Sequence, residues 1–156
     1  MNKIIVVRIA GKQGLTEKIK STFKLLRLYG KYNCIIVPNT PQYLGMIKKV
    51  KDFITWGEVD EKTCKILLEK RGKLPGNISL TESYLKEKIN ISISEFIKEF
   101  TQGKKEFKDI PGLKLFFRLH PPRGGFERKG TKQPYSTGGV LGYRKEKINE
   151  LVQKMI

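Results

Sequence analysis

The residues best able to do chemistry in this sequence stand in a glycine- and proline-rich segment, HPPRGGFERKGTKQPYSTGGVLGYR, residues 120–144. Arginine bridges phosphates or stacks on bases, aromatic rings stack on unpaired bases, and glycine lets one backbone approach another closely. The side chains that this pattern assigns to RNA are Arg123, Phe126, Arg128, Lys129, Lys132, Tyr135 and Arg144. With so few apolar residues, the segment is expected to take its order from a nucleic acid partner. The alternative is a flexible linker.

A second basic set lies near the start of the chain. Gly11-Lys12-Gln13-Gly14 joins a predicted strand to a predicted helix and lacks the spacing of a nucleotide P-loop. Backbone N–H groups at a helix start still attract anions, so the turn is either a phosphate site with Arg8 and Lys12 or an ordinary tight turn. Cations then recur at helical spacing without acidic partners, which favours contact with phosphates over a solvated face. These cations are Lys20, Lys24, Arg27 and Lys31.

The predicted RNA-binding set is completed by Arg118, just before the glycine-rich segment, and His120, its first residue. His120 is the only histidine, and no Ser/His/Asp or Cys/His set forms around it, so contact with phosphate or solvent is favoured over general base catalysis. No pair of carboxylates stands out for acid–base chemistry or for a metal. Cys34 and Cys64 have no metal-ligand spacing, and two buried thiols are favoured over a disulfide. We therefore expect no catalytic residue, metal, cofactor or small-molecule substrate.

The charge of the chain points to a polyanionic partner. There are 32 basic and 15 acidic residues, a net charge of +17. Residues 1–59 and 101–156 each carry +8, whereas residues 60–100 carry +1. A thermophile's enrichment in charged residues would raise both signs, so the imbalance favours a polyanion. The first apolar run is too short for a signal or membrane segment, and we expect a cytoplasmic protein without a membrane partner.

Hydrophobic periodicity predicts the elements that position these residues. The first part reads as β-α-β-α-β, with a small sheet covered on one face. Its predicted strands and helices span 3–9, 16–29, 33–38, 40–51 and 52–59. Predicted helices at 60–71, 81–88 and 92–102, a half-buried strand at 113–119 and a helix at 144–155 follow. Ser92 and Glu95 form a capping box, and Gly30 is expected to stop the helix at 16–29.

Three stretches resemble a known family. They are KIIVVRIAGKQGLTEKIKSTFKLLRL, NTPQYLGMIKKVKDFITWGEV and HPPRGGFERKGTKQPYSTGGVLGYRKEKIN. The first two resemble the large-subunit ribosomal protein thirty family, and the third is similar to its archaeal long form, whose eukaryotic counterpart is large-subunit protein seven. Together they cover the chain nearly end to end.

The resemblance implies an α+β fold with a small ferredoxin-like core at 1–59, a helical addition at 60–112, and a strand, extended basic arm and helix at 113–156. It implies a structural constituent of the large ribosomal subunit that binds and stabilises folded ribosomal RNA. Neighbouring ribosomal proteins are implied partners, and 5S ribosomal RNA is a further candidate partner. A free-standing RNA-binding regulator outside the ribosome is the alternative. An enzyme on the same fold, such as a phosphatase using residues 11–14, is a third hypothesis.

Overall fold

A computed structural model describes residues 3–156, so Met1 and Asn2, at the start of the predicted 1–59 core, lie outside the described residues. One mixed sheet has the strand order β4-β2-β1-β3-β5. The strands are β1 (Lys3–Arg8), β2 (Asn33–Pro38), β3 (Ile54–Glu58), β4 (Phe117–Arg118) and β5 (Gly142–Tyr143). β1 is antiparallel to β2 and β3, β4 is antiparallel to β2, and β5 runs parallel to β3.

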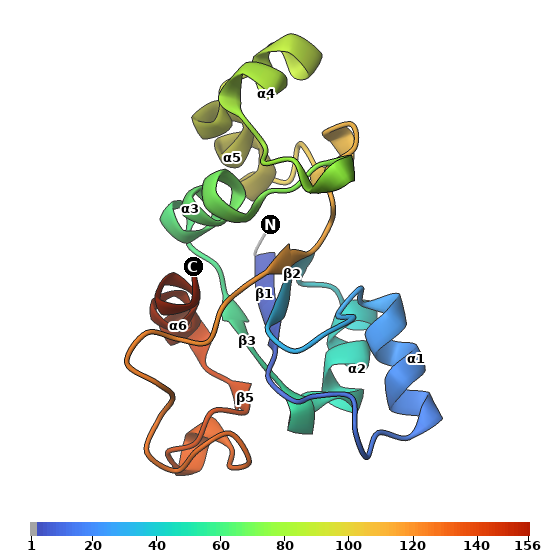
Figure 1. The fold of residues 1–156 in the computed structure, drawn as a ribbon, viewed down its shortest axis with the longest axis vertical. Helices are drawn as coiled ribbons and strands as arrows, with labels where there is room; N and C mark the ends of the chain where they lie inside the picture. Colours follow the sequence, from blue (N-terminus) through green and yellow to red (C-terminus); the bar gives the residue numbers. More distant parts are fainter. Residues whose placement is uncertain (1–2) are drawn as a thin grey trace.

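The helices divide into groups around this sheet. They are α1 (Glu17–Leu25), α2 (Pro41–Lys49), α3 (Glu61–Arg71), α4 (Glu82–Ile89), α5 (Ile93–Thr101) and α6 (Ile148–Met155). Figure 1 shows α1 and α2 together at the lower right, and α3, α4 and α5 together at the top. The predicted α+β class with a helical addition is confirmed.

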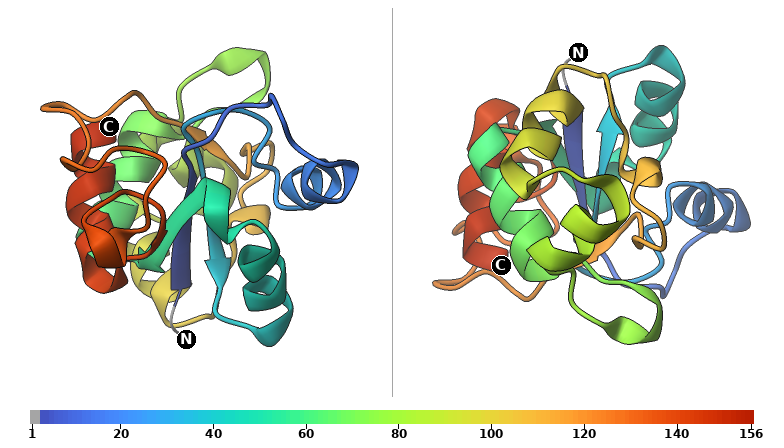
Figure 2. Two further views of the ribbon diagram at one scale, coloured as in Figure 1. Left: turned by 90° about the horizontal axis from the view of Figure 1, so that it is seen from below. Right: turned by 90° about the horizontal axis from the view of Figure 1, so that it is seen from above.

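The central strand β1 buries side chains on both faces of the sheet. Ile4 and Val6 join the hydrophobic cluster formed with α1 and α2, whereas Ile5 and Val7 join a second cluster on the opposite face. Successive side chains of a strand point to opposite faces, so a strand with six buried residues needs cover on both. Figure 2 shows α1 and α2 on one side of the strands and α3 and α6 on the other. The two helices of the first part cover one face as predicted, and the later elements, including α3 and α6, cover the other.

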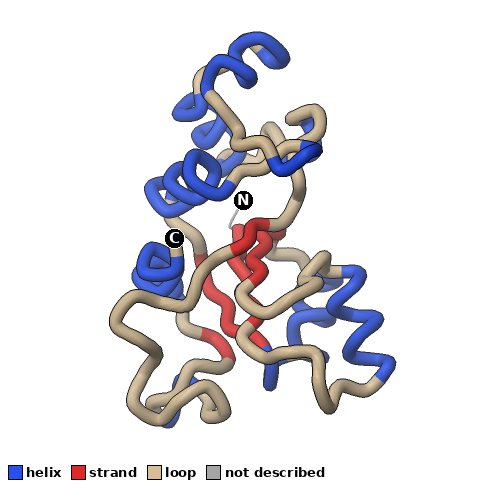
Figure 3. Tube along the Cα trace, viewed as in Figure 1, coloured by secondary structure: helices blue, strands red, loops and turns tan. Residues whose placement is uncertain are grey.

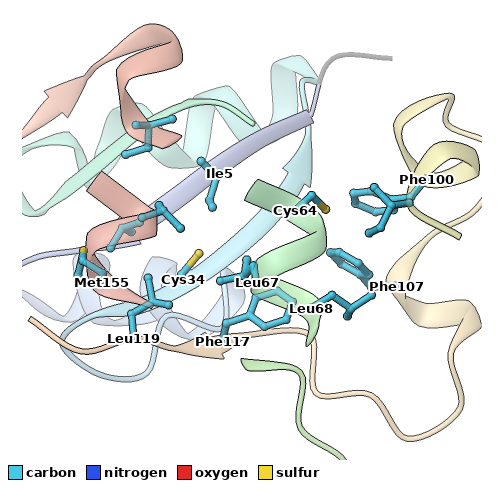
Figure 4. Close-up of a cluster of buried hydrophobic side chains, with 14 of the residues drawn as sticks. Ile5, Cys34, Cys64, Leu67, Leu68, Phe100, Phe107, Phe117, Leu119 and Met155 are labelled. Carbon is cyan, nitrogen blue, oxygen red and sulfur yellow. The ribbon is translucent and has the colours of Figure 1, made fainter. Parts of the chain in front are cut away.

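The second cluster draws on all three predicted parts of the chain. Figure 4 shows it running from Met155 of α6 past Leu67 of α3 and Phe117 of β4 to Phe107, with Ile5 of β1 beside it. These side chains are 0–5% exposed. The helical addition and the C-terminal part therefore share one core with the sheet.

Both cysteines lie in this cluster. Cys34 and Cys64 are buried and free, which confirms the expectation of two buried thiols. Burial raises the pKa of both thiols, that of Cys64 to about 12. They serve as small apolar side chains of the core.

Helix α5 forms as the sequence predicts. The Ser92 hydroxyl accepts a hydrogen bond from the Glu95 amide, and the Glu95 carboxylate accepts one from the Ser92 amide, so the capping box is confirmed. The predicted apolar stripe of this helix is buried, with Phe96 1% and Phe100 3% exposed. Local sequence signals and tertiary packing agree here.

The end of α1 differs from the prediction. The helix stops at Leu25 rather than near Tyr29, because Arg27 adopts a left-handed conformation with φ of 58°. The Leu28 amide then donates to the Phe23 carbonyl over 2.9 Å, which closes a Schellman motif. Leu28 is fully buried in the cluster under α1. Burying Leu28 turns the chain away from the helix axis before Gly30 is reached.

The predicted strand at 113–119 is mostly a loop. Only Phe117 and Arg118 pair with β2, opposite Cys34 and Asn33. The expected alternation in burial is present only from Phe117 to Leu119, where Phe117 and Leu119 are buried and Arg118 is exposed. Lys114, Leu115 and Phe116 are all partly buried, so the prediction of a regular strand is wrong before Phe117.

Candidate nucleic-acid interface

Arg8 braces the turn between β1 and α1 from inside the protein. Its Nε and guanidinium NH2 groups donate to the carbonyls of Ala10 and Gly11 over 2.9 and 2.6 Å. Its other NH group donates to the Leu28 carbonyl over 2.7 Å, and its guanidinium carbon lies 4.0 Å from the centre of the Phe23 ring. Arg8 is 3% exposed, and burial lowers its pKa. The expected direct contact between Arg8 and RNA is corrected, because its donors are used to hold the turn.

This brace orients the turn toward solvent. A trans peptide places its C=O and N–H in opposite directions. With the carbonyls of Ala10 and Gly11 turned inward to Arg8, the N–H groups of Gly11 and Lys12 point outward. Gly11 and Lys12 are exposed. The turn can therefore offer two backbone donors and one ammonium group to an anion.

The basic residues of α1 separate into different surfaces. Lys20 and Lys24 line a hollow together with Lys12, Leu15 and Tyr29. Arg27 and Lys31 follow the end of the helix, so the predicted single stripe is wrong. Arg27 borders a different groove, beside Lys3 and Tyr43. The ammonium of Lys31 lies 4.9 Å from the centre of the Tyr32 ring.

Lys20 also has an acidic partner that the sequence reasoning missed. Its ammonium lies 2.7 Å from the Glu17 carboxylate, one turn earlier in α1. Both side chains are at least half exposed, so the pair contributes little and remains open to exchange for a phosphate.

Aromatic side chains connect this hollow to the edge of the sheet. The rings of Tyr29 and Phe116 meet edge to face, with centroids 5.4 Å apart and planes at 81°. The Arg118 guanidinium carbon lies 5.9 Å from the centre of the Phe116 ring. Tyr29 is 46% exposed, and Arg118 of the edge strand β4 is exposed. Tyr29 and Phe116 were absent from the predicted site, although Phe116 stands at an outward position of the 113–119 alternation.

The glycine-rich segment folds back onto the protein. Figure 3 shows it as a long loop at the lower left that returns to the sheet through β5. The amides of His120 and Arg123 donate to carbonyls of Met155 and Lys154, each over 2.9 Å. Val140 is fully buried in the larger cluster. The expectation that this segment takes its order from a nucleic acid partner is corrected: hydrogen bonds to α6, to β3 and within its own turns hold it.

A partly buried ion pair between Arg144 and Glu127 holds two distant parts of this segment together. The Arg144 guanidinium forms a bidentate pair with Glu127, and one of these contacts spans 2.9 Å. Arg144 Nε donates to the Thr55 hydroxyl of β3 over 2.9 Å, and its NH2 group donates to the Val140 carbonyl over 3.0 Å. Its guanidinium carbon lies 4.6 Å from the centre of the Tyr135 ring. Arg144 is 3% exposed, so the expected RNA contact of this residue is corrected to a role in holding the loop.

The charge state of the pair follows from its surroundings. Burial alone would raise the pKa of the Glu127 carboxyl. The hydrogen bonds and positive charge of Arg144 outweigh burial and lower that pKa below its usual value. Glu127 is therefore ionised at neutral pH, and the pair is held together by charge.

The remaining cations of the segment face outward, whereas its rings face inward. The exposed basic side chains of this loop are Arg123, Arg128, Lys129 and Lys132, and His120 is exposed as well. The Phe126 ring lies 6.1 Å from that of Tyr32, and Tyr135 is covered by Arg144. Phe126 and Tyr135 are only partly exposed. The loop therefore presents charge, and its predicted stacking rings are already engaged.

The near-neutral middle of the chain lies apart from both basic surfaces. Helices α4 and α5 form the upper end of the molecule, and the 11–14 turn and the glycine-rich loop lie at the lower end (Figure 1). Several exposed lysines of the middle have nearby carboxylates, as in the pairs Lys65–Glu69 and Lys86–Glu82 at 3.9 and 3.3 Å. Residues 60–100 carry a net charge of only +1, so the excess of positive charge lies in the other parts of the chain.

Comparison with known proteins decides the family. The model for ribosomal protein L30p/L7e matches residues 4–54. A protein of Methanococcus maripaludis named large ribosomal subunit protein uL30 is 47% identical over 151 residues, 97% of both chains. The chain belongs to the ribosomal protein L30p/L7e family.

Further members of the L30p/L7e family agree along nearly the full chain. The uL30 proteins of Methanopyrus kandleri and Archaeoglobus fulgidus are 46% and 47% identical over 147 and 151 residues. These alignments cover 94% and 96% of this chain, and 99% and 97% of the relatives. The resemblance to the archaeal long form is confirmed, since the match extends through the helical addition and the C-terminal loop.

The described residues of this L30p/L7e protein contain neither a membrane-spanning helix nor a candidate metal site. Between Lys3 and Ile156, no helix combines the length and the apolar character needed to cross a membrane. Over the same residues, His, Cys, Asp and Glu side chains do not gather in groups of three that could hold a metal ion.

Proposed function

We propose that this chain is a structural constituent of the large ribosomal subunit that binds and stabilises folded ribosomal RNA through two surfaces. The first, the turn surface, consists of Lys12, Lys20, Lys24, Tyr29 and Arg118. The second, the loop surface, consists of His120, Arg123, Arg128, Lys129 and Lys132. Its place in the cell is then the cytoplasm, within the large subunit.

The observation that carries this proposal is the exposure, at one end of the molecule, of cations of which, within the described residues, only Lys20 has a carboxylate partner, the exposed Glu17. The two parts of the chain that contribute these surfaces each carry a net charge of +8. The near-neutral middle lies at the opposite end (Figure 1). A phosphate backbone is the abundant anion that can span two such surfaces, and its binding releases counterions. Membership of a ribosomal protein family makes that backbone ribosomal RNA.

We also propose that different parts of the chain contact different partners. Residues 1–59 and 113–156 would bind RNA, and residues 60–112 would support the sheet and meet neighbouring ribosomal proteins. The pairing of surface lysines with carboxylates in α3 and α4 supports this assignment of the middle. 5S ribosomal RNA is a further candidate partner for either basic surface.

The salt dependence of binding to purified large-subunit ribosomal RNA tests the proposal. If the two surfaces neutralise about six to ten phosphates, affinity should fall on the order of 10³–10⁵-fold between 50 and 200 mM salt. Replacing Lys20 and Lys24 by alanine should weaken binding and reduce the slope by about two phosphates. A change of less than about tenfold over that salt range would contradict the proposal.

Sedimentation separates a ribosomal constituent from a free-standing regulator. Washed large subunits should contain this chain in near-unit amount, whereas a regulator would be substoichiometric. None of the relatives named above carries the name of a regulator or an enzyme. Phosphate release by the purified chain would revive the enzyme hypothesis, and loss of that release in Lys12→Ala would place it at the 11–14 turn.

A further inference from the structure

Two aromatic side chains are unusually exposed for their size, Tyr29 at 46% and Tyr143 at 47%. Large exposed rings on a protein with few exposed apolar residues indicate a contact surface. The two rings differ in the charged residues around them and in whether the hydroxyl already has a hydrogen-bond partner. We therefore expect them to have different roles.

Tyr143 is already engaged within the protein. Its hydroxyl donates to the Glu58 carboxylate, and its ring lies 6.2 Å from that of Trp56. The surface around it mixes both signs of charge, with Glu58 and Glu146 beside Arg144, Lys145 and Lys147. The hydroxyl of Tyr143 is already used by a carboxylate, which would also repel a phosphate, so this ring is the less suited of the two to RNA.

Tyr29 has the opposite surroundings. The hollow that it borders contains Arg8, Lys12, Lys20 and Lys24, and its lining includes no carboxylate among the described residues. Over residues 3–156, no hydrogen bond of the Tyr29 hydroxyl is found. A ring bordered by ammonium groups offers stacking and phosphate neutralisation to one nucleotide at once.

The position of the Tyr29 ring is set by structure on both sides. The left-handed Arg27 and the buried Leu28 end α1 and direct the next residue outward. Phe116 then supports the ring edge to face, with centroids 5.4 Å apart. In an edge-to-face contact only one of the two rings uses a face, so Phe116 covers at most one face of Tyr29. The guanidinium of Arg118 lies near the Phe116 ring. Tyr29 therefore keeps ring surface free for a further stacking partner.

We propose that Tyr29, supported by Phe116, is a stacking platform for one unpaired base of the RNA. Lys12, Lys20 and Lys24 neutralise the phosphates beside that nucleotide. This inference rests on the proposed function and goes beyond it, because it names the kind of nucleotide bound: one from a bulge, loop or strand end. A base inside a continuous duplex is stacked on its neighbours and cannot reach the ring.

A matched pair of RNA hairpins tests the platform. One hairpin carries a single unpaired 2-aminopurine in a bulge, and the other places the same base in a continuous stem of equal charge. The wild-type chain should bind the bulged hairpin about tenfold more tightly, in line with the loss of about five- to 150-fold when a stacking residue is replaced by alanine. Binding should quench the 2-aminopurine fluorescence.

Variants at one end of α1 separate stacking from charge. Tyr29→Ala should abolish the preference for the bulge and the quenching, while Tyr29→Phe should keep both because the ring remains. Leu25→Ala is the control, since Leu25, the last residue of α1, is 73% exposed and has no ring. It should bind both hairpins as the wild type does, and all variants should unfold at similar temperatures.

The outcomes distinguish this inference from the function on which it rests. If Tyr29→Ala keeps the bulge preference while replacing Lys20 and Lys24 weakens both hairpins equally, the platform is refuted and RNA binding stands. If Tyr29→Ala binds RNA normally but fails to enter large subunits, the ring contacts a protein, and the inference is likewise overturned. If the wild type binds neither hairpin at about 50 mM salt, the proposed function fails as well.

Discussion

The pair of Arg144 and Glu127 allows a quantitative test of how the glycine-rich loop is held. Glu127→Gln keeps the shape of the side chain and removes the charge that compensates Arg144, which is 3% exposed. Breaking a fully buried pair costs about 3–5 kcal/mol, whereas an exposed pair contributes about 0–1 kcal/mol. The Glu127 side chain is 32% exposed, so its replacement should cost about 2–3 kcal/mol of the free energy of unfolding.

Thermal unfolding measures this cost. For a chain of this size, each kcal/mol lowers the melting temperature by about 2–4 °C, so Glu127→Gln should lower it on the order of 5–10 °C. Glu150→Gln is the control, because it removes the same charge at an exposed position of α6. Hydrogen exchange of the Val140 amide, which donates to the Gln133 carbonyl, should accelerate only in the first variant. Equal melting temperatures for both variants would refute the role of the pair.

The pH dependence of the free energy of unfolding tests the contribution of the Glu127 charge in a second way. The pKa of Glu127 is lowered in the folded chain, so its contribution is fully present above the unfolded value of about 4.3. It is lost as the pH falls through the lowered folded value. The stability difference between wild type and Glu127→Gln should therefore be constant from about pH 6 to 8 and shrink in acid. A difference that grows in acid would show that the sign is wrong.

Three further predictions concern the glycines and cysteines. Gly57→Ala should cost at least about 2 kcal/mol in urea unfolding, since a Cβ at Gly57 would lie 2.0 Å from the Lys145 carbonyl oxygen. Gly45→Ala should instead stabilise the chain by about 0.5–1 kcal/mol, because the Cβ meets open space within α2; a loss of stability would contradict this. Cys34 and Cys64 should resist alkylation in the native state, since burial raises both thiol pKa values. Labelling of either thiol as fast as in urea would exclude the buried arrangement.

The sequence predicted best where local signals and packing agree. In α5, the capping box of Ser92 and Glu95 and the apolar stripe ending at Phe100 both act within one helix, so short-range spacing was sufficient. In α1, the predicted stop at Gly30 was wrong because the burial of Leu28 against the sheet ends the helix earlier. No pattern within the helix itself reports that distant contact.

The prediction of the candidate site was limited for the same reason. Composition showed that both ends of the chain are basic, and the motifs identified the family. The spacing of Lys20, Lys24 and Arg27 suggested a single stripe, which the Schellman motif after α1 divides between two surfaces. The exposure of Tyr29 could be seen only in the folded structure.

The sequence by itself determined the sign and placement of charge, the apolar stripes of the helices and the family. Only the tertiary structure decided which arginines can face RNA. Arg8 and Arg144 are chemically identical to Arg123 and Arg128, yet they are buried among inward-facing carbonyls and beside Glu127. Their partners include residues 20 and 89 positions away along the chain, and the cost of burying an unpaired charge makes those distant contacts decisive.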